Sequence, residues 1–392
     1  MVKKSLLTLF DEIYESPPDI FSSAPGRINI IGEHTDYNQG YVLPAAINFR
    51  IYFLAKKRKD DQVLLWAQNF EERIQFSLDD LSTSKQKRWA NYVKGILWVL
   101  EREGFHLQGI NGLIWGDIPL EAGLSSSAAM EVSIINGLDT LFNLRLDKKS
   151  KAFLAQKAEN DFVGVKCGIM DQFISLFGEK KKALFLDCET FSFELIPFEI
   201  EREGLSILVY DTQVRRELAS SEYNKRRKEA LEAFHYLKGR GYRTFKEVNL
   251  EMLEKIRGGM GDVSYRRALH VVSENTRVRE AVKALRENDF LRLGELLFQS
   301  HESLRDNYEV SCAELDLLYE TGRGFPGCLG ARLTGAGFGG SGIALVENPR
   351  VHLFKNTLFE GAEKRELKKP KMYEIVVDEG AQAHHLTKEE RR

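Results

Sequence analysis

The sequence predicts an α+β protein with two domains, on three observations. Short segments of strand character separated by turns occupy residues 21–78. Helical periodicity takes over after Ser125 and dominates residues 220–321. The chain has 392 residues, against a typical domain of roughly 150 residues, so we expect two units, each with its own core.

The first half begins with segments that favour β-strands. They are residues 27–31, 51–56, 63–68 and 73–78, and a further one at 112–115 leads into the turn GDIPLEAG. The short connections between them are typical of an antiparallel sheet. They argue against a parallel, doubly wound sheet in this half.

Helices follow in the sequence. Ile134, Leu138 and Leu141 recur at i, i+4 and i+7 and therefore share one helical face. A second helix is predicted over residues 150–161, and a third begins near Asp171.

The domain boundary is predicted shortly before residues 205–211, LSILVYD, which indicate a buried strand. The predicted domains are residues 1–190 and 191–392. The second domain is mostly helical until a glycine-rich turn leads into a strand at residues 342–347.

Composition and charge exclude several classes of function. The formal net charge of -2 argues against nucleic acid or an anionic membrane as a partner. Asp11 and Glu12 interrupt the apolar start, so it is not a signal peptide, and no apolar run reaches the roughly 18–20 residues of a membrane span. We therefore expect a cytoplasmic protein.

The four cysteines are predicted to be buried thiols. Cys167, Cys188, Cys312 and Cys328 lie far apart and form no C-x-x-C pair, which disfavours a disulfide framework or a zinc site. Cys167 lies close to Asp171 in the sequence, but no nearby histidine is available to activate it as a nucleophile.

The first motif, residues 24–44, reads APGRINIIGEHTDYNQGYVLP. Strand alternation places Arg27 and Asn29 on one face, and Gly32 then releases the chain into a polar loop. Donors and acceptors suited to sugar hydroxyls gather there in Glu33, His34 and Asp36. A surface turn or a metal site also fits the loop, although no H-E-x-x-H spacing supports a transition metal.

The second motif, residues 118–133, reads IPLEAGLSSSAAMEVS. Gly123 and three serines directly precede an amphipathic helix, whose first N–H groups and positive dipole end favour an anion such as phosphate. Helix capping alone would explain one of the serines. The chain has no Walker A loop, so a phosphate site here is of another type.

The third motif, GAGFGG at residues 335–340, satisfies G-x-G-x-x-G only formally. It leads into a strand, whereas a dinucleotide fingerprint opens a helix. Close backbone packing between two domains is the alternative interpretation.

Two carboxylates carry alternative interpretations. Asp171, in KCGIMDQFISLFG, is a candidate acid or base, but it could equally be a helix N-cap. Glu159 is either a solvated helix residue or a metal ligand.

Together the three motifs resemble the galactokinase family, within the wider superfamily that includes homoserine and mevalonate kinases. The resemblance extends through RWANYVKG at residues 88–95, AENDFVGVKCGIMDQ at 158–172 and ASSEYNKRR at 219–227. The first motif is specific to galactokinase-like members, whereas the second and third are shared across the superfamily.

The resemblance implies a two-domain sugar kinase. Its N-terminal domain would resemble ribosomal protein S5 domain 2, its C-terminal domain would be ferredoxin-like, and the active site would lie between them. The implied reaction is ATP-dependent phosphorylation of D-galactose at the C1 hydroxyl, with ATP as co-substrate and Mg²⁺ as cofactor. A monomer or weak oligomer is expected.

Two other functions stay open beside it. One is a kinase for a related sugar, such as N-acetylgalactosamine or arabinose. The other is a non-catalytic sensor that binds galactose and ATP.

The resemblance also implies roles for individual residues. Asp171 would be the base at the sugar C1 hydroxyl, and Arg27 would neutralise charge beside it. The sugar would be held by Glu33, His34, Thr35, Asp36, Gly168 and Tyr223. ATP would be bound by Glu121, Ala122, Gly123, Leu124, Ser125, Ser126, Ser127 and Trp89, although Trp89 could instead be an ordinary core residue. Mg²⁺ would be held by Ser127 and Glu159.

One position departs from the family. Where its members usually have a small glycine, this chain has Glu121, at the start of the phosphate loop (residues 121–127). A carboxylate facing the phosphates would repel them, so we expect the Glu121 side chain to point away from the nucleotide.

Overall fold

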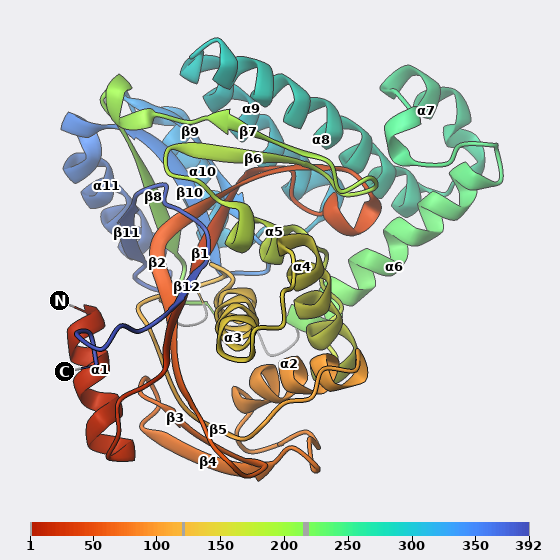
Figure 1. Ribbon diagram of the computed structural model, residues 1–392. Coiled ribbons are helices and arrows are strands. Elements are labelled where there is room, and N and C mark those ends of the chain that lie inside the picture. The colour runs from red at the N-terminus through yellow and green to blue at the C-terminus, as the bar shows by residue number, and fades with distance from the viewer. Residues whose placement is uncertain (1, 120–121, 215–218, 392) are drawn as a thin grey trace.

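The computed structural model describes residues 2–119, 122–214 and 219–391. Within them the chain forms an eight-stranded and a four-stranded sheet with helices packed around both (Figure 1). The predicted α+β class and two-part organisation are confirmed.

The larger sheet has the order β12-β1-β2-β5-β3-β4, and β6 continues it by pairing with β2 and β7. Its strands are β1 (Ile20–Ile31), β2 (Tyr41–Lys57), β3 (Gln62–Ala67), β4 (Glu72–Ser77), β5 (Ile110–Gly116), β6 (Lys182–Asp187), β7 (Phe193–Pro197) and β12 (Gln382–His385). All twelve residues of β1 are buried, so this strand forms the centre of the molecule.

One pairing in this sheet differs from the antiparallel expectation. β3 and β5 run parallel, because the chain passes through helix α2 (Ala90–Arg102) between β4 and β5 and enters β5 in the direction of β3. The other pairings of the sheet are antiparallel.

The smaller sheet is antiparallel with the order β11-β8-β10-β9. Its strands are β8 (Leu205–Asp211), β9 (Cys328–Thr334), β10 (Ser341–Glu347) and β11 (Lys371–Ile375). β8 is buried along its whole length, as the run LSILVYD predicts.

Helices cover both sheets. The remaining ones are α1 (Val2–Tyr14), α3 (Ser126–Phe142), α4 (Lys148–Lys157), α5 (Met170–Phe177), α6 (Ala219–Lys238), α7 (Leu250–Ile256), α8 (Asp262–Arg286), α9 (Phe290–Ser303), α10 (Ala313–Gly324) and α11 (Val351–Lys364). α3 and α5 pack on β1 and β2, whereas α8 and α9 lie over the opposite side of these strands (Figure 1). No helix of the described ranges is long and apolar enough to span a bilayer.

A single core joins the two sheets. One hydrophobic cluster contains Ile28 of β1, Ile207 of β8, Leu297 of α9 and Ile343 of β10. The side chains that face the first sheet therefore pack directly on those of the second.

The division at 190/191 falls between β6 and β7, two strands that pair with each other in the larger sheet. The chain changes sheet between β7 and β8, and β12 near the C-terminus returns to pair with β1. The two-domain boundaries therefore stay a prediction, and no single cut separates the sheets.

Candidate active site

A cavity of about 360 Å³ opens beside the loop between β1 and β2. It is lined by Arg27, Glu33, His34, Asp36, Tyr37, Glu159, Gly164, Val165, Lys166, Cys167, Gly168, Met170, Asp171, Tyr223, Asn224, Gly335 and Ala336. Segments as far apart in the chain as Arg27 and Ala336 thus converge on one space.

An ion pair between Arg27 and Asp171 lies in this cavity. Arg27 Nε donates to Asp171 Oδ1 at 2.7 Å and Nη2 donates to Oδ2 at 2.9 Å, so the contact is bidentate. Arg27 Nη1 also donates to the carbonyl of Gly123 at 2.8 Å. The guanidinium therefore ties the carboxylate to the phosphate loop.

Ser125 makes a second link between that loop and Asp171. Its hydroxyl donates to Oδ2 of Asp171. Ser125 has a φ of 60°, a left-handed conformation that is costly for a residue other than glycine, and this backbone aims the hydroxyl at the carboxylate. The sequence assigned Ser125 to ATP, whereas its side chain contacts the candidate base.

The helix-cap interpretation of Asp171 is not supported by the geometry. The N-cap residue of α5 is Ile169, and Asp171 lies inside the first turn. Its carboxylate is bound to Arg27 and Ser125 from other elements. Asp171 is thus placed for chemistry in the cavity.

Glu33 is buried, with one carboxylate oxygen held by the third motif. Its Oε1 accepts hydrogen bonds from the N–H of Gly335 at 2.8 Å and from Thr334 Oγ1 at 3.1 Å. Burial raises the pKa of Glu33, while Arg332 and Arg27 oppose that rise. The carboxylate is fixed on its inner side and lines the cavity.

His34 contributes a neutral imidazole. Burial is the main cause that lowers its pKa to about 3. Nδ1 lies 2.7 Å from the hydroxyl of Tyr37, whereas Nε2 is buried without a hydrogen bond within the described residues. The ring lies 5.8 Å from that of Tyr223. An unsatisfied nitrogen beside a polar cavity is suited to a ligand hydroxyl.

Asp36 and Gly168 touch across the cavity. A Cβ built on Gly168 would lie 1.7 Å from Oδ2 of Asp36, so only glycine fits there. Burial, and then repulsion from Asp171, raise the pKa of Asp36 to about 7. Two acidic groups therefore share one small space, which suits a ligand that donates several hydrogen bonds.

Glu159 lies at a distortion of the helix that follows α4. Residues Ala158–Val163 form a π-helix, an irregularity that often occurs at functional sites. Glu159 is 4% exposed, and its Oε2 accepts from Cys167 Sγ at 3.1 Å and from Gln172 Nε2 at 2.9 Å. The solvated-helix alternative for Glu159 is therefore wrong.

Ser127 and Glu159 are neighbours. Burial raises the pKa of Glu159, and hydrogen bonds from Cys167 and from Ser127 oppose the rise. Burial and the Glu159 carboxylate raise the pKa of the Cys167 thiol far above its ordinary value, which agrees with its poor prospects as a nucleophile. The cysteines are free thiols throughout the described chain.

Several predicted site residues do not line the cavity: residues 122–127 of the phosphate loop, Thr35 and Trp89. The hydroxyl of Thr35 contacts the carbonyls of Gly32 at 2.8 Å and Tyr41 at 2.6 Å, so it braces the loop from within. Trp89 is 9% exposed and donates to Glu72 Oε2 at 2.7 Å, as a core tryptophan would.

The phosphate loop packs against β1 at Gly26 and Arg27. Its carbonyls are held by the protein: Ser341 Oγ donates to Ala122 O, and Arg27 N donates to Leu124 O at 3.1 Å. Ser125, the N-cap residue of α3, provides no side-chain cap, so the first N–H groups of that helix are open to an anion. Glu121 lies outside the described residues.

The third motif reaches the cavity from β9. Gly335, Gly337, Gly339 and Gly340 all have positive φ, which explains the glycines. A Cβ on Gly337 would lie 2.3 Å from the carbonyl of Val310, so the backbone packs closely here, within the second predicted domain rather than between the two.

Several lining residues were missed by sequence reasoning. They are Tyr37, Gly164, Val165, Lys166, Met170 and Asn224. Tyr37 lies inside the first motif and could have been found there. The loop at residues 164–168 lies in the segment AENDFVGVKCGIMDQ, from which sequence reasoning selected Gly168 but not its neighbours.

Known proteins match this chain over nearly its whole length. The galactokinase galactose-binding signature matches residues 8–57, the GHMP kinases N terminal domain matches 91–179, and the GHMP kinases C terminal domain matches 281–358. These segments carry the first motif, the phosphate loop and the third motif.

Individual relatives agree with these matches. The chain is 47% identical to the galactokinase of Pyrococcus furiosus over 84% of this chain and 89% of that protein. It is 42% identical to the galactokinase of Staphylococcus carnosus over 96% and 98% of the two chains. The crystal structure of Lactococcus lactis galactokinase complexed with galactose superposes with a TM-score of 0.93 at 39% identity, covering 97% of this chain and 100% of that one.

A more distant likeness concerns the fold alone. The mevalonate kinase of Methanococcus jannaschii superposes with a TM-score of 0.64 at 18% identity, covering 92% of this chain and 98% of that one.

Proposed function

This chain belongs to the galactokinase family, and we propose that the cavity around Asp171 is where it carries out the ATP-dependent phosphorylation of D-galactose at the C1 hydroxyl. One observation carries the assignment of the site. The bidentate Arg27–Asp171 pair, joined through Ser125 to the phosphate loop, lies in the same cavity as the polar side chains of the first motif.

The sugar half of the cavity is made of the β1–β2 loop and the side chains that face it. Its donors and acceptors come from Glu33, His34, Asp36 and Tyr223. The unsatisfied Nε2 of His34 and the acidic groups give a mixed set of partners, as the hydroxyls of a sugar require. Gly168 leaves room for Asp36 and for the ligand. Thr35 holds the loop and is not assigned to the ligand.

Asp171 would act at the C1 hydroxyl. A sugar hydroxyl is a poor nucleophile near pH 7, so a carboxylate that accepts its proton, or orients it and stabilises the developing charge, assists the transfer. Arg27 makes a bidentate pair with the Asp171 carboxylate and would add a positive charge next to the transferring phosphoryl group. Most of the catalysis of such a reaction is positioning and electrostatic stabilisation.

ATP would enter along the phosphate loop. The carbonyls of Ala122, Gly123 and Leu124 accept hydrogen bonds from protein donors, and the N–H of Ala122 donates to Pro119 O, so the phosphates would be bound at the α3 N-terminus. Ser126 and Ser127 open that helix.

The donor set at Ser127 and Glu159 fits Mg²⁺. Both supply oxygen, the ligand that this ion prefers, and Mg²⁺ is usually held by one or two carboxylates together with substrate phosphates. Among the described residues no three His, Cys, Asp or Glu side chains form a metal site on their own. Bound there, the ion would neutralise charge on the phosphates of ATP.

A coupled ADP-release assay tests the function. We expect galactose to give the highest kcat/KM in a panel with glucose, N-acetylgalactosamine, arabinose and mevalonate, and a sugar 1-phosphate as product by phosphorus NMR. A clear preference for N-acetylgalactosamine or arabinose would change the substrate. Binding of galactose and ATP without turnover would favour a sensor.

The metal assignment has its own test. We expect Ser127→Ala and Glu159→Gln to raise the Mg²⁺ concentration needed for half-maximal ATP binding by on the order of tenfold, measured by calorimetry. Glu103→Gln is the control, because this exposed residue pairs with Lys157 outside the cavity. Unchanged Mg²⁺ titrations in both variants would remove the two residues from the metal site.

The location and the oligomeric state of the protein also belong to this proposal. The sequence favours a cytoplasmic protein that is a monomer or weak oligomer, and size-exclusion chromatography with light scattering measures the second property.

A further inference from the structure

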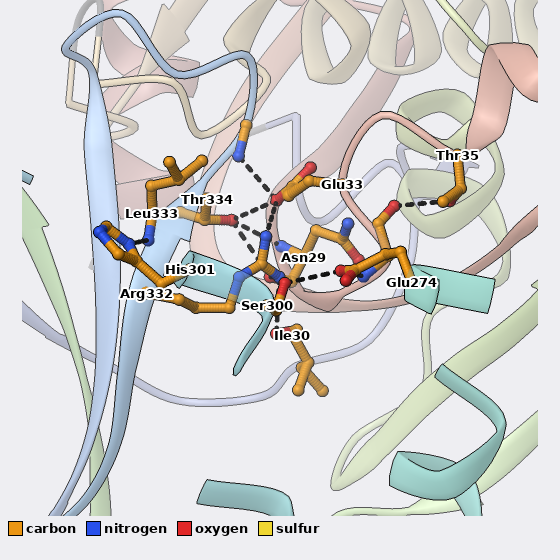
Figure 2. A network of polar contacts seen from close by, with 12 residues as sticks. Asn29, Ile30, Glu33, Thr35, Glu274, Ser300, His301, Arg332, Leu333 and Thr334 are labelled. Atoms are coloured by element: carbon orange, nitrogen blue, oxygen red, sulfur yellow. Dashed lines mark hydrogen bonds and ion pairs between the residues drawn. The ribbon is translucent and has the colours of Figure 1, made fainter. Parts of the chain in front are cut away.

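A buried polar network packs against the β1–β2 loop, and Figure 2 shows the part of it around Glu33, Glu274, Arg332 and Thr334. We call it the anchoring network. Its members are His270, Glu274 and Asn275 of α8 and Arg332 and Thr334 of β9, each at most 3% exposed. None of the five lines the cavity.

Three side chains of α8 hold the backbone of the loop. His270 Nε2 lies 3.0 Å from the carbonyl of Glu33, so this nitrogen carries the proton and donates. Glu274 Oε1 accepts from the N–H of Gly32 at 2.9 Å. Asn275 Oδ1 accepts from the N–H of Tyr41 at 2.8 Å.

The spacing of these residues explains how one helix reaches both ends of the loop. Positions 270 and 274 lie one turn apart on the same face of α8, and Asn275 is the next residue, about 100° further around the helix, toward the start of β2. The loop is thus held where it leaves β1 and where it enters β2.

Arg332 holds the Glu33 side chain from β9. Nη1 donates to the carbonyl of Ile30 at 2.9 Å, and Nη2 lies 3.3 Å from Glu33 Oε1. The same oxygen accepts from Thr334 and Gly335 (Figure 2). Three groups of β9 and the third motif therefore converge on one oxygen and fix the carboxylate that lines the cavity.

The charges of the network are balanced without solvent. Burial would raise the pKa of Glu274, but Arg277, His270 and Arg332 outweigh it and hold that pKa at about 2, so Glu274 is ionised. Arg332 is attracted by Glu33 and Glu274 together. Removing Arg332 leaves two buried carboxylates without their shared cation.

We propose that Arg332 and Glu274 are positioning residues for the sugar: from the second half of the chain they fix Glu33 and the backbone of the β1–β2 loop in the geometry that binds galactose. The proposal rests on the proposed function, because it acts through Glu33. Sugar affinity then depends on Arg332 and Glu274, whereas ATP affinity does not, because neither side chain bonds to the phosphate loop within the described residues.

Steady-state kinetics of Arg332→Met test it. We expect KM for galactose to rise at least about tenfold while KM for ATP changes less than about twofold, since Arg332 bonds to Asn29, Ile30 and Glu33 and not to the phosphate loop within the described residues. Arg332→Lys, which keeps the charge, should give an intermediate KM. The affinity for galactose alone, measured as the sugar-dependent rise in Tm, should fall in parallel.

Arg50→Met is the matched control. Arg50 is also buried, also donates to two backbone carbonyls (Glu379 and Gly380, both at 2.8 Å) and lies outside the cavity lining. Its loss should lower Tm without raising KM for galactose. If Arg332→Met does not fold, Thr334→Val removes one of the three donors to Glu33 at nearly constant volume and takes its place.

Two results would overturn the proposal: a folded Arg332 or Thr334 variant with galactose KM within about twofold of the parent, or an equal rise in KM for both substrates. Failure of the proposed function is distinguishable, because it appears in the unmodified protein as absence of galactose turnover.

Discussion

The two sides of the cavity are anchored in opposite ways. The β1–β2 loop is held by its backbone, through Gly32 N, Tyr41 N and Glu33 O, which leaves its side chains to face the cavity. The phosphate loop is held by the carbonyls of residues 122–124, and the α3 N-terminus that follows has no side-chain cap, so its first N–H groups are available to an anion.

This difference separates recognition by side chains from recognition by the backbone. A sugar is identified by the pattern of its hydroxyls, which requires particular side chains. Phosphate needs only positive potential and N–H groups, which any residue in the correct conformation supplies. Side-chain substitutions should therefore change the kinetic constants strongly on the sugar side and weakly on the phosphate side. The exception is a phosphate-loop side chain that contacts Asp171.

The largest effect should come from Asp171, where the two sides meet. We expect Asp171→Asn to lower kcat at least about a hundredfold in a folded protein, because the charged acceptor at the C1 hydroxyl is lost. The control is Asp147→Asn: Asp147 caps α4 by accepting from Ser150 N at 3.0 Å, and asparagine caps equally well. Near-normal kcat in folded Asp171→Asn would contradict the assignment.

Ser125 is the phosphate-loop residue whose side chain contacts Asp171, so its substitution tests this exception. We expect Ser125→Ala to lower kcat about tenfold, since a hydrogen bond to a charged group contributes about 1.5–3 kcal/mol, with KM for ATP changed less than about threefold. Ser125→Gly relieves the positive φ but also lacks the hydroxyl, so it should behave like the alanine variant.

Ser175→Ala is the control for Ser125. This hydroxyl lies on the same helix as Asp171 but donates to the carbonyl of Pro25 at 2.9 Å. If Ser125→Ala raises KM for ATP and leaves kcat unchanged, Ser125 binds the phosphates rather than Asp171. No side chain of the phosphate loop would then be an exception to the difference between the two sides.

Sequence patterns predicted residues that line the cavity but not the residues that hold them in position. Glu33, His34, Asp36 and Asp171 were predicted because they lie in compact motifs. Arg332 and Glu274 stand alone in an ordinary strand and an ordinary helix, and only the packing of α8 and β9 against the loop gives them a role.

Prediction of the fold from sequence has the same limit, because local patterns identify some elements but not those that depend on distant parts of the chain. The apolar run of β8 predicts a buried strand on its own, and the stripe of Ile134, Leu138 and Leu141 predicts α3. β12, with the sequence QAHH, has no strand signal and becomes a strand only because β1 offers it an edge. Long-range pairing of this kind is decided by tertiary context rather than by local propensity.

Asp36, on the sugar side, should make the stability of the protein depend on pH. Its pKa of about 7 lies above the value of about 3.8 in an unfolded chain, so the native state binds more protons than the unfolded state between these values. Stability from this group is therefore complete at acidic pH and lost as pH rises through 7. Asp36→Asn should raise Tm at pH 8, and the gain should shrink as pH falls from 7 toward 4.

Calorimetry at several pH values measures this gain, which should be a few degrees because about 1 kcal/mol shifts Tm by roughly 2–4 °C in a larger domain. Asp171 is the second cause of the raised pKa, so the gain should be smaller in an Asp171→Asn background. If the rise in Tm caused by Asp36→Asn does not vary with pH, the pKa of Asp36 is not raised in the folded protein.

The smallest effect is expected at Glu121, on the phosphate side, which lies outside the described residues. A carboxylate about 4 Å from a phosphate charge, at an effective dielectric of about 20, would be repelled by on the order of 4 kcal/mol and would weaken ATP binding roughly a thousandfold. A working kinase does not tolerate this, so the side chain should point away. We expect Glu121→Gly to change KM for ATP by less than about fivefold. A hundredfold gain in affinity would place the carboxylate against the phosphates and show that side chains matter on this side too.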